Sequence, residues 1–334
     1  MIQGEEELKN VVNKYVKSDE PGLSLIIGQD KEILFEGYYG LADLDKCKAI
    51  GKDTKFLTAS LTKQITCAAL LILEERGLVD LETSLLEFFP NFPIFYEKVN
   101  IINLMTHTSG IKEYLDDNFF DNTANKYIEK EKVIETISKF DNLDFKPGTK
   151  FKYSNSGYVL LGDIIEKITN ESFGEFIEEN IFDVLNMKNS FILDKNSKNR
   201  IDEIACGYKH DSKFKWKKVD LTNDVIGWAD GNMVSNIRDL FIWINSLSCE
   251  KVINKKLEDR IFKPYILQNG ESSDYGLGWF IENDGYYHTG TTSGYISKIH
   301  IKKEDGYTVI MLSNNDSIDR DRFFEDIFKF VYKE

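Results

Sequence analysis

Strand-like segments lie at both ends of this chain, and amphipathic helical segments fill its middle. Residues 23–43 hold two runs rich in β-branched and aromatic side chains, joined by a Gly-Gln-Asp-Lys turn. Residues 275–313 hold several more such runs, the last with an Asp305-Gly306 turn suited to a hairpin. Between them, apolar residues recur at spacings of three and four, which is typical of amphipathic helices. Strands from the two ends are therefore expected to meet in one sheet.

This order predicts an α+β fold with one antiparallel sheet built from both chain ends. Helices at residues 5–18 and 320–334 would flank the sheet, and an all-helical lobe would be inserted between its two halves. Residues 1–334 would form a single unit of two lobes. The sheet-containing lobe would comprise residues 1–58 and 225–334, and the mainly helical lobe residues 59–224.

Charge and cysteine spacing exclude several classes of function. The net charge of -14 disfavours a nucleic-acid partner, because phosphate binding needs clustered lysine and arginine. No apolar stretch approaches the roughly 20 residues that span a bilayer. The four cysteines are far apart and form no Cys-x-x-Cys pair, so we expect reduced thiols and no zinc site. No metal or other cofactor is expected.

The amino terminus, "MIQGEEELKNVVNKYVKSDE", has acids where a secretory signal has bases and lacks a continuous apolar stretch. As it stands, the sequence predicts a cytoplasmic protein. A chain from which an export leader had been removed would look the same, so an extracytoplasmic location stays open. The oligomeric state is also open.

A serine and a lysine share one face of a helix at residues 57–66, "LTASLTKQIT". Ser60 and Lys63 are three positions apart, which places their side chains on the same side. Taken alone, Ser60 could be a helix N-cap and Lys63 a solvated charge. However, the helix that follows is apolar on most sides, and burial of a lysine favours its neutral amine, which can accept a serine's proton.

A second cluster, "FKPGTKFKYSNSGYVLLG", spans residues 145–162. The Tyr153 phenol could move protons to a leaving group, and the Asn155 amide could donate to a substrate carbonyl. The alternative is a tyrosine packed in the core and an asparagine that caps the next helix.

A third cluster, "YYHTGTTSGY", spans residues 286–295 on a strand that leads into a turn. The small residues Thr289, Gly290 and Thr291 expose backbone N–H groups, which are the donors that an oxyanion needs. His288 and the hydroxyls could meet a substrate carboxylate. The alternative is a hairpin bend with an incidental histidine.

Together, Ser60-x-x-Lys63, Tyr153-Ser154-Asn155 and His288-Thr289-Gly290 resemble the motifs of the serine β-lactamase-like hydrolases, in the same order. The Tyr-Ser-Asn motif points to the branch of class C β-lactamases, D-alanyl-D-alanine carboxypeptidases and penicillin-binding proteins. The segments "LMTHTSGI", "GNMVSNIRDL" and "YGLGW" fit the same superfamily, and the resemblance runs from about residue 20 to 315.

The resemblance implies a β-lactamase/transpeptidase-like fold and a role for each motif. Ser60 would be the acylated nucleophile, Lys63 its proton acceptor and Tyr153 the partner acid and base. Backbone N–H groups of Ser60 and Thr291 would form the oxyanion hole. The substrate-binding residues would be Asn155, His288, Thr289, Gly290, Thr291 and, as a wall of the cleft, Trp228.

Two histidines bear on which activity the resemblance implies. His288 stands where many penicillinases have lysine and offers a weaker, pH-dependent positive charge. This difference favours a peptidase or esterase over a penicillinase. His107, in "THTSG", lies outside the three catalytic motifs, and we expect a structural, hydrogen-bonded side chain.

The function expected is that of a metal-free serine hydrolase that forms an acyl-enzyme on an amide or ester carbonyl. The favoured activity is D-alanyl-D-alanine carboxypeptidase-like and penicillin-binding. The alternatives are a class C-like β-lactamase and a small-ester esterase. The substrate would be a small molecule or peptide, namely a D-amino-acid peptide, a β-lactam or an ester. An alternative from another functional class is a penicillin receptor that is non-catalytic or deacylates very slowly.

Overall fold

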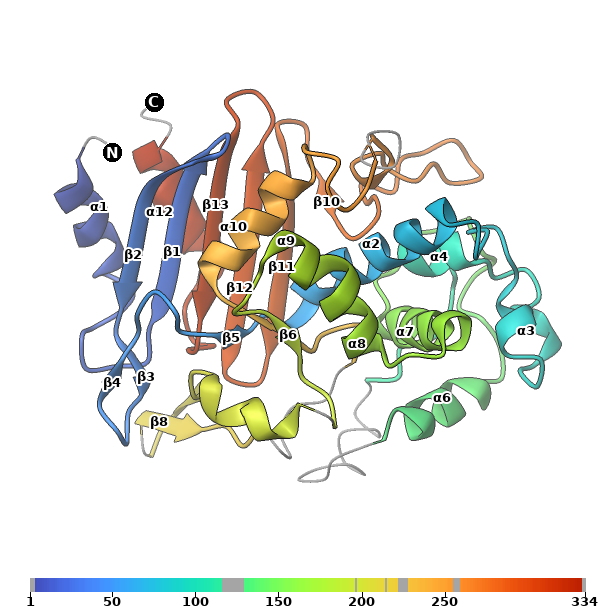
Figure 1. Cartoon of the computed structure of the whole chain (residues 1–334), viewed down its shortest axis with the longest axis horizontal. Helices are drawn as coiled ribbons and strands as arrows, with labels where there is room; N and C mark the ends of the chain where they lie inside the picture. The colour runs from blue at the N-terminus through green and yellow to red at the C-terminus, as the bar shows by residue number, and fades with distance from the viewer. Residues whose placement is uncertain are drawn as a thin grey trace.

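A six-stranded antiparallel sheet built from both ends of the chain forms one lobe (Figure 1). The strand order β10-β11-β12-β13-β1-β2 places the amino-terminal β1 directly beside the carboxy-terminal β13, as expected. The strands are β1 Leu23–Gln29, β2 Glu32–Tyr39, β10 Phe280–Ile281, β11 Gly285–Thr292, β12 Tyr295–Lys302 and β13 Tyr307–Ser313. The computed structural model describes residues 4–115, 129–195, 197–213, 215–221, 228–254 and 259–331.

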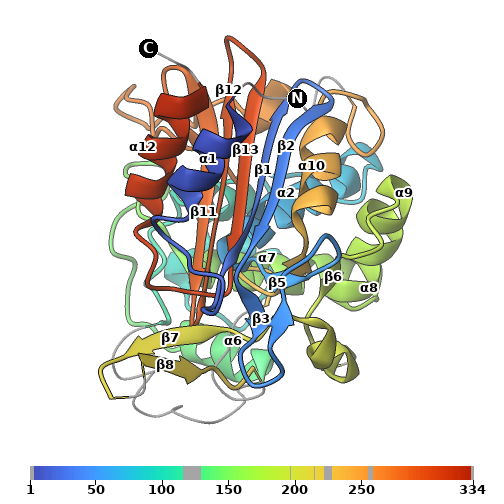
Figure 2. The same ribbon diagram turned by 90° about the vertical axis from the view of Figure 1, so that its left-hand side faces the viewer.

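Helices cover both faces of this sheet. On one face lie the two terminal helices, α1 (Glu5–Val12) and α12 (Arg320–Val331), side by side (Figure 2). On the other face lies α10 (Ile237–Ser246), packed against β1 and β13. Strand β1 is accordingly buried on both sides, since Leu25 and Ile27 join the core under the terminal helices and Ile26 joins the core on the opposite face.

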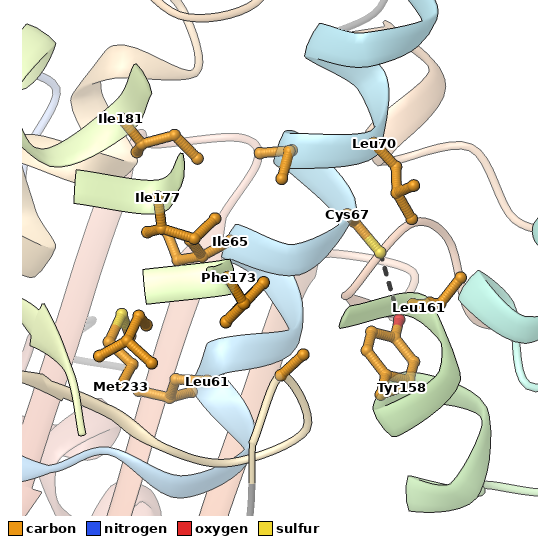
Figure 3. Packing of buried hydrophobic residues seen from close by; sticks show 14 of the residues in the cluster. Leu61, Ile65, Cys67, Leu70, Tyr158, Leu161, Phe173, Ile177, Ile181 and Met233 are labelled. Atoms are coloured by element: carbon orange, nitrogen blue, oxygen red, sulfur yellow. Dashed lines mark hydrogen bonds between the residues drawn. The ribbon is translucent and has the colours of Figure 1, made fainter. Parts of the chain in front are cut away.

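The second lobe is mainly helical and is inserted between β2 and β10 (Figure 1). Its central helix, α2, is buried from Thr62 to Leu73. Side chains of neighbouring helices pack around α2, and the Cys67 thiol lies 3.2 Å from the Tyr158 hydroxyl (Figure 3). The helices and helical turns of this lobe are η1 Ala59–Leu61, α2 Thr62–Glu75, α3 Leu85–Phe88, η2 Ile94–Tyr96, α4 Ile101–Met105, α6 Lys130–Ser138, α7 Asn155–Thr169, α8 Phe173–Ile177, the π-helical η3 Glu178–Phe182, α9 Asp183–Leu185 and η4 Lys198–Glu203.

The inserted segment differs from the expected all-helical lobe because it also contains short strands. Strand β9 pairs with β5 on one side and β6 on the other, and β7 pairs with β8. These strands are two to four residues long, too short for the alternation of apolar and polar residues that predicts a strand. The short strands are β3 Leu41–Asp43, β4 Lys48–Ala49, β5 Phe56–Leu57, β6 Phe191–Ile192, β7 Tyr208–Asp211, β8 Lys215–Lys218 and β9 Met233–Ser235.

Strand β5 leads directly into η1 and α2, so the chain passes from the sheet lobe into the helical lobe at Ser60. Strand β11 packs against η1 at this crossing. In the ranges that the structure describes, none of the helices is long and apolar enough to cross a membrane.

Candidate active site

Ser60 lies on a tight backbone corner between β5 and α2. Ala59 has a φ of 50°, in the left-handed region that a residue with a side chain rarely adopts. The corner is held because Thr58 donates both its N–H and its hydroxyl to the Met233 carbonyl, at 2.8 and 2.9 Å. The Ser60 side chain makes no capping bond to the helix, so the N-cap alternative does not hold. Its hydroxyl is half-buried and reachable.

Lys63 is fully buried, and its amine has three partners. The Nζ atom lies 2.7 Å from the Asp230 backbone oxygen, 2.8 Å from Asn155 Oδ1 and 3.3 Å from Ser60 Oγ. The first two partners are carbonyl oxygens and can only accept, so they take two N–H groups. In its neutral form the amine would have its lone pair left for the Ser60 hydroxyl. This geometry suits a base that removes the serine proton.

The amino terminus of α7 presents Asn155 to Lys63. Ser154 is the N-cap of this helix and accepts from Gly157 N–H, so the capping role falls to the serine rather than the asparagine. Because Asn155 Oδ1 accepts from Lys63, its Nδ2 faces away from the amine. That N–H₂ group has no hydrogen-bond partner among the described residues and can donate to a substrate carbonyl.

Tyr153 lies beside the amine with its ring face toward it. The Lys63 Nζ atom is 4.9 Å from the ring centroid, and no hydrogen bond joins it to the phenol. Within the described part of the chain the Tyr153 hydroxyl has no hydrogen-bond partner. The phenol is thus available to a substrate atom.

His288 differs from the expected charged group. Its ring is 1% exposed and both nitrogens are occupied, Nδ1 by the Thr289 carbonyl at 2.7 Å and Nε2 by the Tyr275 hydroxyl at 3.0 Å. A carbonyl only accepts, so the proton sits on Nδ1 and Nε2 accepts from Tyr275. Burial, aided by the charge of Lys63, lowers the pKa of His288 to about 3. The expectation that its positive charge meets a substrate carboxylate is therefore wrong, because the ring is neutral and fully hydrogen-bonded.

Gly290 allows β11 to approach the backbone turn at residues 58–60, called the serine corner below. A Cβ atom at this position would lie 2.2 Å from the Thr58 carbonyl oxygen and 2.3 Å from Ser297 Oγ. Side chains alternate along a strand, so Thr289 and Thr291 point to the opposite face from Gly290. Strand β10 pairs with β11 only at residues 286–287, which leaves the edge of β11 beyond them without a partner strand among the described residues.

Trp228 lies two residues before Asp230, whose backbone oxygen accepts from Lys63. Its ring lies 6.5 Å from the Tyr114 ring and lines a cavity of about 350 Å³ together with Glu166 and Asn170, near the carboxyl end of α7. Its backbone N–H donates to Asp230 Oδ1 at 2.7 Å and so fixes the turn whose carbonyl holds Lys63.

Sequence reasoning missed two residues at the site. The Asp230 backbone oxygen holds Lys63, while burial raises the pKa of the Asp230 carboxyl. Arg320, at the start of α12, donates to the Gly290 carbonyl at 3.0 Å and to Thr291 Oγ1 at 3.1 Å. The "WADGN" turn and the helix start carry no local signal for these contacts, which form only when distant segments meet.

A metal site is not apparent in the described ranges, where no group of three or more histidine, cysteine, aspartate or glutamate side chains could hold an ion.

Comparisons with known proteins agree with this arrangement. The chain is 29% identical over 309 residues to penicillin-binding protein 4* of Bacillus subtilis (strain 168), covering 88% of this chain and 68% of that protein. It is also 29% identical over 309 residues to protein Flp of Staphylococcus aureus (strain MW2), covering 90% of this chain and 61% of that protein. The chain thus spans about three fifths to two thirds of the length of these relatives.

Among solved structures, the octameric penicillin-binding protein homologue from Pyrococcus abyssi superposes with a TM-score of 0.85 at 24% identity. The match covers 99% of this chain and 77% of that one, which shows a shared fold. The Beta-lactamase family profile matches residues 8–331, and the chain therefore belongs to the Beta-lactamase family.

Proposed function

We propose that this protein is a serine hydrolase that acts on an amide or ester carbonyl through an acyl-enzyme on Ser60. The observation that carries the proposal is the hydrogen-bond set of Lys63, in which two carbonyl oxygens occupy two N–H groups and the third partner is the Ser60 hydroxyl. An amine held in this way, and shielded from water, is a suitable general base.

The reaction would proceed in two halves. Ser60 Oγ attacks the carbonyl carbon while its proton passes to Lys63, and the carbonyl oxygen becomes an oxyanion that accepts from the N–H groups of Ser60 and Thr291. The carbon–leaving-group bond then breaks, Tyr153 delivers a proton to the departing nitrogen or oxygen, and the proton held by Lys63 passes to the Tyr153 phenolate. A water molecule attacks the acyl carbon by the same route and releases the acid, which restores the Ser60 hydroxyl.

For the substrate, we favour a D-amino-acid peptide such as one ending in D-alanyl-D-alanine. The motifs and the penicillin-binding relatives support this choice over a small ester. Because His288 is neutral, the third motif does not supply the lysine charge of many penicillinases, which makes a β-lactamase the less favoured alternative.

A substrate panel tests the proposal. Rates would be measured on a D-alanyl-D-alanine peptide, on nitrocefin and on short-chain p-nitrophenyl esters, with Ser60→Ala as the control. We expect turnover of the peptide that Ser60→Ala abolishes while its circular dichroism spectrum and melting temperature stay unchanged. Full activity of Ser60→Ala on any of these substrates would refute the mechanism.

Burst kinetics separate a hydrolase from a slowly deacylating penicillin receptor. A hydrolase releases product continuously, whereas a receptor releases about one equivalent of the first product per chain and then stops. A burst without turnover on every substrate of the panel would make the receptor the better description.

A further inference from the structure

His107 is hydrogen-bonded to the backbone on both sides of Tyr153. Its carbonyl oxygen accepts from Lys152 N–H at 2.9 Å, and its ring Nδ1 accepts from Ser154 N–H at 3.1 Å. The two residues that flank Tyr153 are therefore both bonded to one residue of the helical lobe, which follows α4. These two hydrogen bonds restrict movement of the Tyr153 backbone.

The His107 ring also supports the Tyr153 ring. Their centroids are 4.1 Å apart with an interplanar angle of 31°. Tyr158 and Tyr275 pack against the same imidazole at 5.0 and 4.7 Å, and His107 is 1% exposed. The phenol ring thus contacts the imidazole and also the Lys63 amine, which is 4.9 Å from its centroid.

The backbone of His107 is strained, which is unusual for a residue whose only role is packing. Its φ is 56°, in the left-handed region. A non-glycine residue persists there only where the surrounding structure determines its position, and such residues cluster at functional sites. The strain turns the imidazole and the carbonyl oxygen toward the same short segment, residues 152–154.

The His107 ring is held in one tautomer. Ser154 N–H can only donate, so Nδ1 is the unprotonated nitrogen and Nε2 carries the proton. Within the described residues that buried Nε2 has no partner, although buried polar groups normally find one. Burial, aided by the charge of Lys63, holds the pKa of His107 well below its usual range. The ring therefore remains a neutral acceptor.

We propose that His107 is a positioning residue that fixes the Tyr153 phenol beside Lys63, through two backbone hydrogen bonds and ring stacking. The inference rests on the proposed function, in which Tyr153 exchanges protons with the substrate. His107 itself touches neither the substrate nor the Ser60 oxygen. It acts through Tyr153 alone.

Two variants separate the two contributions of the ring. His107→Asn retains an acceptor near the Nδ1 position and tolerates a positive φ, but it removes the stacked ring. His107→Phe retains the ring and removes the acceptor. We expect each to lower kcat by at least about tenfold with KM within about threefold of wild type, because substrate binding does not involve Tyr153's exact placement. His300→Asn, which alters another buried histidine, paired with Tyr287 across the β11–β12 ladder, should leave kcat unchanged.

Amide hydrogen exchange tests the two backbone hydrogen bonds of His107, called the clamp below, without relying on activity. In the unsubstituted protein the N–H groups of Lys152 and Ser154 should both be protected, and His107→Phe should release Ser154 selectively. Rapid exchange of either amide in the unsubstituted protein would overturn the inference, as would a wild-type kcat in both His107 variants while Tyr153→Phe is inactive. Full activity of Tyr153→Phe would instead refute the proposed function and leave the exchange result as the test of the clamp.

Discussion

Gly290→Ala is the substitution whose effect follows most directly from the geometry of the site. The added methyl carbon would lie 2.2 Å from the Thr58 carbonyl oxygen, 2.3 Å from Ser297 Oγ and 3.2 Å from the Ala59 Cβ. Two of these separations are below any normal contact with carbon. Thr58 cannot yield easily, because its N–H and hydroxyl are both bonded to the Met233 carbonyl. Strand β11 must therefore move away from the serine corner.

Overpacking of this kind lowers the free energy of unfolding by about 1–3 kcal/mol. The effect on catalysis should be larger, because a shift of β11 carries the Thr291 N–H away from the oxyanion. Loss of one oxyanion donor typically costs about 10²–10³ in kcat. We expect Gly290→Ala to lose activity in this range on whichever substrate of the panel is turned over best, while it remains folded at 25 °C.

Gly231→Ala is the matched control. It also lies next to Ala59, but its added Cβ would come no closer than 4.0 Å to any heavy atom beyond the adjacent residues 230 and 232. Its activity and melting temperature should stay within about twofold and a few degrees of wild type. A Gly290→Ala protein with wild-type kcat and stability would show that β11 does not hold the oxyanion donor against the serine corner.

Three further substitutions probe the site. Lys63→Met removes the amine but keeps the buried volume, so acylation should slow by about 10²–10⁴ in stopped-flow assays while the melting temperature holds. His288 is neutral when folded, so protonation of the unfolded chain below its ordinary pKa of 6.5 should remove about 2 kcal/mol of stability between pH 7.5 and 5. His288→Gln, which keeps an acceptor for Tyr275, should lose that part of the pH dependence in urea titrations, and an unchanged slope would contradict the assignment. Arg320→Met removes the donor that holds the Gly290 carbonyl, so kcat/KM should fall by about tenfold, and a wild-type value would exclude a role in positioning β11.

The local spacing of apolar residues in the sequence was enough to predict the sheet and the terminal helices. Apolar spacing in residues 320–334 predicts a one-sided helix, and Phe323, Phe324 and Ile327 lie in the core that this helix shares with β1 and β13. The buried face of α2 followed from its lack of a polar side, and Lys63 is indeed buried within it. The short strands β6 and β9 escaped prediction because their pairing depends on partners distant in the sequence, and β7 and β8 because each has only four residues.

The site was predictable only as far as its motifs extend. Ser60, Lys63, Tyr153 and Asn155 lie together as the motif resemblance implied. The neutral state of His288 was not predictable, because it depends mainly on the burial of the ring in the folded protein, where Tyr275, from outside the motif, occupies Nε2.

Peptide-resolved mass spectrometry of a trapped acyl-enzyme tests the central claim most directly. The protein would be mixed with an activated acyl donor, quenched in acid within milliseconds to minutes, and digested. We expect one acyl group per chain on the peptide that contains Ser60, formed at least about 10² times more slowly in Lys63→Met. An adduct on another residue, or equal rates of Ser60 acylation with and without the Lys63 amine, would contradict it.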